Sequence, residues 1–184
     1  MRISSITQKG FTLVELLIVV VILAILAAIV VPQLASTTDD ARASSADSSL
    51  AVLRAAIDHY YQQHNNTYPG AVTAKPAAAC AGTKGKGNAS NAAKQAQAFL
   101  EQLTLYTDVR GGACSVGDAI NHKYGPYLKQ SSIPADPFVN IAALEVVSTG
   151  DLNLTASADP GPGGFKYDIK TGKIIINLRA EETR

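Results

Sequence analysis

A single carboxylate, Glu15, stands near the start of an otherwise apolar stretch of 21 residues, 11–31. Hydrocarbon offers a carboxylate neither water nor a ready counter-ion, so a charge at this position is costly unless a partner neutralises it. A cut of the chain after Gly10 would create such a partner, the new ammonium group of Phe11. Glu15 is therefore a candidate functional residue whose chemistry is charge pairing, and Gly10 and Phe11 are candidate processing residues.

Other side chains that could perform catalysis do not form a recognisable centre. His59 and His64 are five residues apart, which places them on different faces of a helix and disfavours a shared metal ion. His122 stands alone beside Lys123. The serines form no nucleophile elbow and the glycines form no phosphate-binding motif. We therefore predict that the protein is not an enzyme.

The apolar stretch is long enough to cross a membrane, because 21 residues of helix at about 1.5 Å each match a hydrocarbon core of about 30 Å. Its leader, residues 1–10, carries Arg2 and Lys9. A secretory signal peptide loses its apolar region on cleavage, whereas a cut at Gly10 would keep it. By the positive-inside rule, the leader stays in the cytoplasm and the C-terminal part faces outward. An ordinary single-pass anchor is the alternative, but it leaves the intramembrane carboxylate unexplained.

The chain has two cysteines, Cys80 and Cys114, and both lie on the outward side of the predicted span. In an oxidising compartment, two lone cysteines are best interpreted as one disulfide. The bond would close a loop of 35 residues, for which the chain-entropy estimate is about 4 kcal/mol of stabilisation. A metal site is disfavoured because the sequence has no Cys-x-x-Cys motif and no cluster of Cys and His.

Beyond the span, residues 32–64 are predicted to continue the helix. Pro32 removes one helical hydrogen bond and crowds the preceding turn, so a kink or weak point is expected near residues 28–32. Residues 36–49 are small and polar and are expected to face solvent or another subunit. From residue 50 onward, apolar side chains at helical spacing predict one face packed on a globular head. These side chains are Leu50, Leu53, Ile57, Tyr60, Tyr61 and His64.

Residues 65–184 are predicted to form that head. The low-complexity segment 71–93 is expected to be a surface loop. Residues 92–106 have the apolar spacing of a short helix, and residues 143–148 alternate weakly as a strand does.

Near the C-terminus, two β-rich runs, 164–170 and 173–178, are joined by Thr171 and Gly172, which is a strong hairpin signal. The predicted fold class is α+β. A long N-terminal helix, membrane-spanning in its first half, packs on a small C-terminal antiparallel β-sheet.

Charge gives no strong indication of a nucleic-acid partner. The formal net charge is +1, and removal of the leader changes it to −1, so no strong attraction to nucleic acid or anionic lipid follows. Lys75, Lys84, Lys86 and Lys94 make the 71–94 region mildly basic. We interpret them as a solvated surface in preference to a contact with DNA or another partner.

The most specific motif is residues 9–18, KGFTLVELLI. It resembles the processing and assembly motif of type IV pilins and type II secretion pseudopilins. The resemblance implies cleavage between Gly10 and Phe11 by a prepilin peptidase, N-methylation of Phe11, and pairing of Glu15 with the N-terminal amine of an adjacent subunit. Pro32 is similar to a proline of the family pattern. Alternatively, in the monomer, Glu15 satisfies only its own helix N-terminus.

Two further motifs, Gly-Pro-Tyr-Leu at 125–128 and Pro-Ala-Asp-Pro-Phe-Val-Asn at 134–140, resemble a signature of major pseudopilins. Phe138 and Val139 depart from the tryptophan and glycine of that signature. The C-terminal hairpin, 163–173, resembles the closing hairpin of pseudopilins and several pilins.

The resemblance implies a homopolymer joined through N-terminal helices in the bacterial inner membrane, with a periplasmic or extracellular head and an external assembly platform protein and ATPase. The first functional hypothesis is a type II secretion pseudopilus subunit. A type IV pilin acting in adhesion, motility or DNA uptake is the second, and a monomeric membrane-anchored binding protein is the third.

Major pseudopilins bind structural calcium in a C-terminal loop, so the resemblance also raises a metal hypothesis. Asp136, Asp151, Asn153 and Asp159 supply oxygens of the right hardness. No fixed calcium-loop spacing matches, and the alternative is a solvated polar loop.

Overall fold

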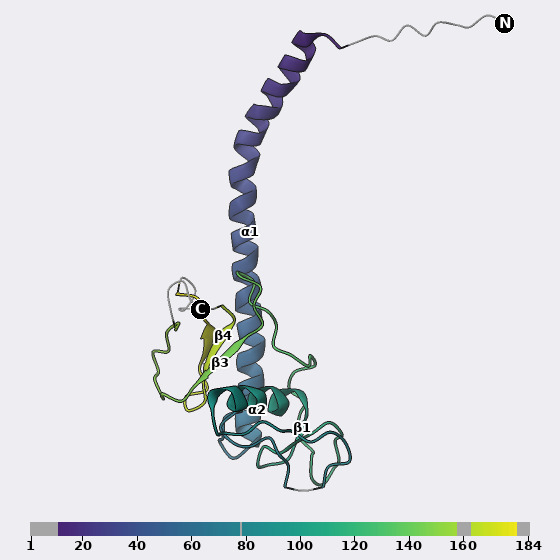
Figure 1. Ribbon diagram of the computed structural model, residues 1–184, viewed down its shortest axis with the longest axis vertical. Coiled ribbons are helices and arrows are strands. Elements are labelled where there is room, and N and C mark those ends of the chain that lie inside the picture. Colours follow the sequence, from purple (N-terminus) through teal and green to yellow (C-terminus); the bar gives the residue numbers. More distant parts are fainter. Residues whose placement is uncertain (1–10, 78, 158–162, 180–184) are drawn as a thin grey trace, which may run out of the picture. The chain divides into compact units, whose positions relative to one another are not determined.

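The computed structural model describes residues 11–77, 79–157 and 163–179, with the side chains of residues 32 and 34–36 left out of the description. The chain divides into two compact units between Ala41 and Arg42. Helix α1 (Leu13–Gln63) contributes to both units. It is drawn from purple to blue in Figure 1.

The first unit contains the apolar part of α1. The segment Leu13–Val31, with a mean hydropathy of 3.3, is long and apolar enough to cross a membrane. Its large apolar side chains, together with Phe11, are between 46% and 87% exposed. The helix assignment continues without a break through Pro32, as expected. Nothing within the described first unit covers these side chains.

In the second unit, the C-terminal part of α1 buries one face. The buried side chains recur at helical steps of three and four residues, which confirms the predicted packing face. They are Ala46, Leu50, Leu53, Ala56, Ile57, Tyr60 and His64. Tyr61, which was also predicted on this face, is half-buried. The same core includes Phe99 and Leu103 of helix α2 (Ala92–Thr104) and the inward side chains of the sheet.

Helix α2 confirms the helix predicted at 92–106, although it ends two residues earlier. The side chain of Asn91 caps its start by accepting a hydrogen bond from the backbone N–H of Lys94 at 3.0 Å. Its C-cap is Leu105, whose extended backbone donates a hydrogen bond to the carbonyl of Glu101 at 3.0 Å. Strand β1 (Tyr106–Thr107) follows directly, and its Tyr106 pairs with Cys114 of strand β2 (Ala113–Cys114).

The C-terminal sheet has the order β3-β4-β5, and Figure 1 shows β3 and β4 side by side. Strands β4 (Phe165–Asp168) and β5 (Ile174–Ile176) form the predicted antiparallel hairpin. Strand β3 (Leu144–Val147) pairs with β4 in parallel. The sheet is therefore mixed, and the expectation of an all-antiparallel sheet is corrected. The reason is the long connection from Val147 to Phe165, because a parallel pair requires a crossover of about a dozen residues or more.

The disulfide between Cys80 and Cys114 is present, with an S–S distance of 2.01 Å and a Cα–Cα distance of 5.8 Å. The loop around it is less exposed than its composition suggested. Ala74 is fully buried beside Ala98 and Ala113 in a small second core. The backbone N–H groups of Ala74 and Ala113 bond the carbonyls of Gly87 and Ala74, respectively. Small residues therefore serve here for close packing.

Candidate functional site at the start of α1

Glu15 lies in the first turn of α1. Thr12, directly before the helix, is its capping residue. The Oε2 atom of Glu15 accepts hydrogen bonds from the backbone N–H of Thr12 at 2.8 Å and from the Thr12 hydroxyl at 2.7 Å. The hydroxyl oxygen of Thr12 in turn accepts a bond from the backbone N–H of Glu15 at 3.2 Å. This reciprocal arrangement is a capping box, which satisfies N–H groups that a helix start leaves without partners.

These bonds give Glu15 polar neighbours but no opposite charge. Among the residues that the structure describes, no cationic side chain is paired with its carboxylate. Phe11, which would be the first residue after cleavage, is 87% exposed and lies outside the helix. Gly10 lies outside the described residues. In the described part of one chain, the start of α1 thus presents a carboxyl group that is capped but has no cation beside it.

The sequence contained the signal for this geometry, because Thr12 and Glu15 have the Thr-x-x-Glu spacing of a capping box. We expected that, in the monomer, Glu15 could satisfy its own helix N-terminus, and the contacts with Thr12 agree with this alternative. The contribution of Thr12, as donor and acceptor, was the part that we missed.

The carboxylates considered for calcium do not converge on one site. Among the described residues, no group of three or more His, Cys, Asp or Glu side chains could hold a metal ion. Asp136 is fully buried, and its two oxygens accept four backbone N–H bonds. The donors are Phe138 at 3.1 Å, Val139 at 2.9 Å, Ile141 at 3.2 Å and Gly164 at 2.8 Å. These donors occupy the lone pairs that a cation would need.

The two other described calcium candidates, Asp151 and Asn153, are exposed and do not join a ligand group. Asp151 is exposed and accepts one bond, from the backbone N–H of Asn153 at 2.8 Å. Asn153 is also exposed, and Asp159 lies outside the described residues. The donor set that the structure describes therefore does not fit a structural calcium ion.

Asp168 is a structural carboxylate that the sequence analysis did not identify. It is buried at the end of β4 and accepts bonds from the Thr149 hydroxyl and from the backbone N–H groups of Gly150 at 2.7 Å and Lys170 at 2.7 Å. Burial acts to raise the pKa of Asp168, but these hydrogen bonds outweigh it and hold the pKa below its usual value. Asp168 thereby fixes both the β4–β5 turn and the loop after β3.

The three histidines serve different structural roles. His64 is buried, with Nδ1 2.8 Å from the carbonyl of Tyr60 and Nε2 2.9 Å from the hydroxyl of Thr107. Because a carbonyl only accepts, Nδ1 carries the proton of the neutral ring. Burial lowers the pKa of His64, partly opposed by the bond to Tyr60 and the charge of Asp108.

His59 is exposed, whereas His122 is buried beside Asp118, with Nδ1 3.3 Å from the Asp118 carboxylate. The structure therefore does not bring the histidines together as a metal site among the described residues.

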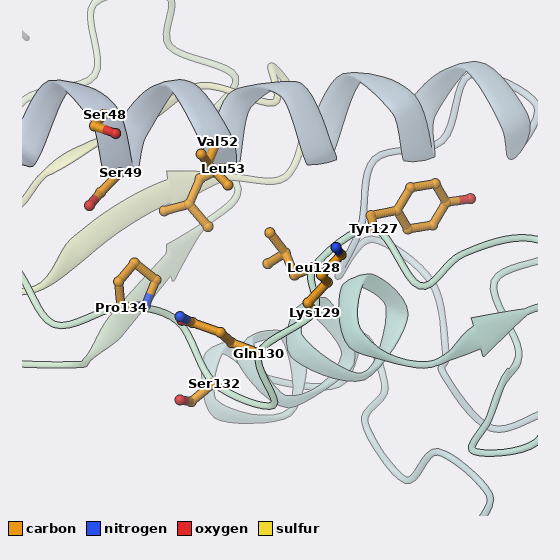
Figure 2. A pocket seen from close by; sticks show the side chains of 10 residues that line it. All are labelled: Ser48, Ser49, Val52, Leu53, Tyr127, Leu128, Lys129, Gln130, Ser132 and Pro134. Carbon is orange, nitrogen blue, oxygen red and sulfur yellow. The ribbon is translucent and has the colours of Figure 1, made fainter.

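The second unit also has an open groove of about 380 Å³. Figure 2 shows α1 on one side and the segment 127–134 on the other. Leu53 and Leu128 are its buried apolar members, and serines with Lys129 and Gln130 supply the polar ones. No carboxylate or histidine lines it, so the groove lacks the paired acid and base that hydrolytic chemistry requires.

Comparison with known proteins identifies the N-terminal region. A family described as the prokaryotic N-terminal methylation motif matches residues 6–31. The matched segment includes Gly10, Phe11 and Glu15 and ends directly before Pro32. No curated protein and no solved structure matches the chain significantly. The chain therefore carries, at the start of a long apolar helix, the prepilin-peptidase signal of type IV pilins and pseudopilins.

Proposed function

We propose that this chain is a structural subunit of a filament that is assembled from the bacterial inner membrane. The observation that carries the proposal is Glu15, which lies within the matched motif at the start of an exposed apolar span and, among the residues that the structure describes, has no cation beside it. A carboxylate drawn into an apolar environment is strongly penalised when alone and much less when paired. Cleavage after Gly10 would supply the ammonium of Phe11 on a neighbouring subunit, so pairing would favour assembly and set the axial register.

The proposal includes a processing and assembly route. A prepilin peptidase would remove residues 1–10 and leave a methylated Phe11. Before assembly, residues 11–31 would span the inner membrane, with the N-terminus in the cytoplasm and residues 32–184 outside. A platform protein and an ATPase would then move each subunit into a homopolymer, in which neighbouring helices cover the exposed apolar side chains. The chain itself would perform no catalysis.

Within this class, a type II secretion pseudopilus subunit that acts in protein export is our first choice. The pseudopilin-like motifs support it, because they are built into the second unit. Leu128 is buried, and the backbone N–H groups of Tyr127 and Leu128 both bond the carbonyl of Leu103, at 2.9 and 2.8 Å. Asp136 holds its own loop through four backbone bonds.

A type IV pilus subunit is the second candidate. The observation that favours it is the loop between Cys80 and Cys114, which their disulfide closes. This mid-chain bond departs from the pseudopilin pattern on which the first choice rests. A monomeric membrane-anchored binding protein is the third candidate, and it requires that Glu15 be dispensable.

The proposal is tested in cells that lack the native chain and are complemented with either wild type or Glu15→Ala. Mass spectrometry of the mature protein measures cleavage, and immunoblots of sheared surface material measure filaments. We expect both chains to begin at methylated Phe11 and only the wild type to yield filaments. An uncut wild-type chain, or equal filament yields, would contradict the proposal.

The two filament classes are separated in the same strains. Loss of exported enzymes from the medium with normal motility and adhesion would assign the pseudopilus. Loss of long surface fibres with normal export would assign the type IV pilus.

A further inference from the structure

The region around the disulfide carries a cationic pocket that the filament proposal does not use. The pocket has a volume of about 380 Å³ and lies between two loops, 108–112 and 118–122. Arg110 lies in the first loop and Asn121 lies in the second. Lys123 directly follows the second loop. A volume of this order falls within the range of small-ligand and peptide-side-chain sites.

Each of the two loops is held by an aspartate at its start. Asp108 Oδ1 accepts the backbone N–H groups of Arg110 at 2.7 Å and Gly112 at 2.9 Å. Asp118 Oδ1 likewise accepts the backbone N–H groups of Ile120 and Asn121. These bonds fix the backbone on both sides of the pocket, so a ligand would lose little affinity to the ordering of the loops.

The loops are also tied to each other at their base. The backbone of Thr107 exchanges two hydrogen bonds with Tyr124, at 2.8 and 3.2 Å. Cys114, between the loops in sequence, is bonded to Cys80. The pocket is therefore built by a cross-linked scaffold, although the side chains at its rim are exposed.

Its charge is positive and available. Among the residues that the structure describes, neither Arg110 nor Lys123 takes part in an ion pair, and Lys123 lies 5.1 Å above the ring of Tyr124. Asp108 is the one carboxylate among the lining residues, and backbone N–H groups already bond it. Among the lining residues, two cations and one anion leave a net charge of +1, which suits a side-chain carboxylate. The nearby Asp118 does not line the pocket, and its oxygens bond two backbone N–H groups and His122.

The rim is also apolar. Ile120 is 85% exposed and Val109 is 41% exposed, and both line the pocket. Exposed aliphatic side chains beside cations fit a ligand that alternates carboxylates with apolar groups. A nucleic-acid backbone would instead bring consecutive phosphates past Asp108 and gain nothing from Ile120, so the lining favours a peptide.

We propose that this pocket binds an acidic peptide segment of a partner protein, with Arg110 and Lys123 facing its carboxylates and Ile120 contacting its apolar side chains. The inference adds a recognition surface to the head and does not depend on whether the filament is a pilus or a pseudopilus.

The test uses the full chain in micelles of an uncharged detergent and measures fluorescence anisotropy. The probes are a labelled Glu-Leu-Glu-Leu-Glu peptide, its Gln-Leu-Gln-Leu-Gln counterpart and a short DNA duplex. We expect the acidic peptide to bind at least tenfold more tightly than the glutamine peptide and to weaken as salt is raised, because the charges are at the surface.

The variants locate the site. Arg110→Ala and Lys123→Ala should each weaken acidic-peptide binding about threefold to tenfold, as expected for exposed or partly desolvated charge pairs. Lys75→Ala and Lys84→Ala are matched controls, since these exposed lysines of the same region do not line the pocket. They should change binding less than twofold. Far-UV circular dichroism checks that each variant is folded.

Three results would overturn the assignment. The first is that the glutamate and glutamine peptides bind equally, or that the acidic peptide does not bind at millimolar concentration. The second is an equal loss in the control variants. The third is tighter binding of the DNA duplex that Arg110→Ala abolishes, which would assign the pocket to nucleic acid.

Discussion

Asp136 offers a quantitative test of how the second unit is held together. Its buried carboxylate connects the loop 136–141 to the start of β4, because its donors are three N–H groups of that loop and the N–H of Gly164. Replacement by alanine removes all four bonds at once. The N–H of Gly164 is buried and would lose its partner, whereas Val139 and Ile141 are exposed enough for water to replace the carboxylate.

The magnitude follows from these different fates. An orphaned buried N–H costs about 1–3 kcal/mol, and a bond that water can replace costs about 0.5 kcal/mol or slightly more. We therefore expect Asp136→Ala to lower the free energy of unfolding by about 3 kcal/mol. For a chain of this size, that corresponds to a decrease in Tm of about 10 °C.

The assay is thermal unfolding of the full chain in detergent, followed by near-UV circular dichroism of the tyrosines, since Tyr60 and Tyr167 are fully buried in the core. Asp151→Ala is the matched control. Its carboxylate is exposed and accepts one bond from Asn153, so its removal should change stability by less than about 0.5 kcal/mol.

The addition of calcium distinguishes a carboxylate that acts through backbone hydrogen bonds from one that binds a metal ion. If Asp136 acts through backbone hydrogen bonds, calcium and a chelator should leave the Tm of the wild type unchanged. Equal effects of Asp136→Ala and Asp151→Ala would refute the reasoning, as would a calcium-dependent Tm that Asp151→Ala abolishes.

Three further predictions concern other parts of the second unit. Because burial lowers the pKa of His64, its contribution to stability should be complete above pH about 6.5 and fall as the pH decreases toward the lowered pKa. In His64→Gln, the urea-unfolding midpoint should therefore change less between pH 7 and 5 than in the wild type, and an equal change would contradict this. The pKa of Asp168 is also lowered, so the stability that its carboxylate contributes should be present above pH about 4 and be lost as the pH falls through the lowered pKa. Asp168→Asn should remove that acid-dependent loss, and a pH dependence of stability equal to that of the wild type would argue against this role of Asp168. Replacing both Cys80 and Cys114 by serine should lower the free energy of unfolding by up to about 4 kcal/mol, measured in urea, and a variant as stable as the oxidised wild type would show that hydrogen bonds alone hold this loop.

The sequence predicted the elements whose determinants are local. Apolar spacing identified the buried face of α1, and Thr171 with Gly172 marked the hairpin between β4 and β5. Gly172 has a positive φ of 72°, which glycine adopts without strain.

Among features that depend on distant partners, the disulfide was predicted from the count of two cysteines, but two others were not. The parallel pairing of β3 with β4 depends on the path of a long connection, which composition does not define. Asp136 was considered as a calcium ligand because its oxygens suit the ion, but its actual donors include Gly164, which is 28 residues away in sequence.

At the N-terminus, the capping box was encoded locally by Thr12 and Glu15 and was visible in the sequence. Within residues 11–77, 79–157 and 163–179, no cation neutralises Glu15. In the proposed filament, assembly supplies such a cation, and two substitutions separate charge pairing from capping.

The most direct measurement compares filament yield in Glu15→Gln and Thr12→Ala, with cleavage to Phe11 checked by mass spectrometry in each strain. Glu15→Gln keeps an oxygen that can accept the Thr12 hydrogen bonds but removes the charge, whereas Thr12→Ala keeps the charge but removes the hydroxyl. If charge pairing between subunits drives assembly, Glu15→Gln should yield cleaved subunits without filaments, and Thr12→Ala should yield filaments near the wild-type amount. The reverse pattern, with filaments retained in Glu15→Gln and lost in Thr12→Ala, would contradict charge pairing and show that Glu15 serves only to cap its own helix.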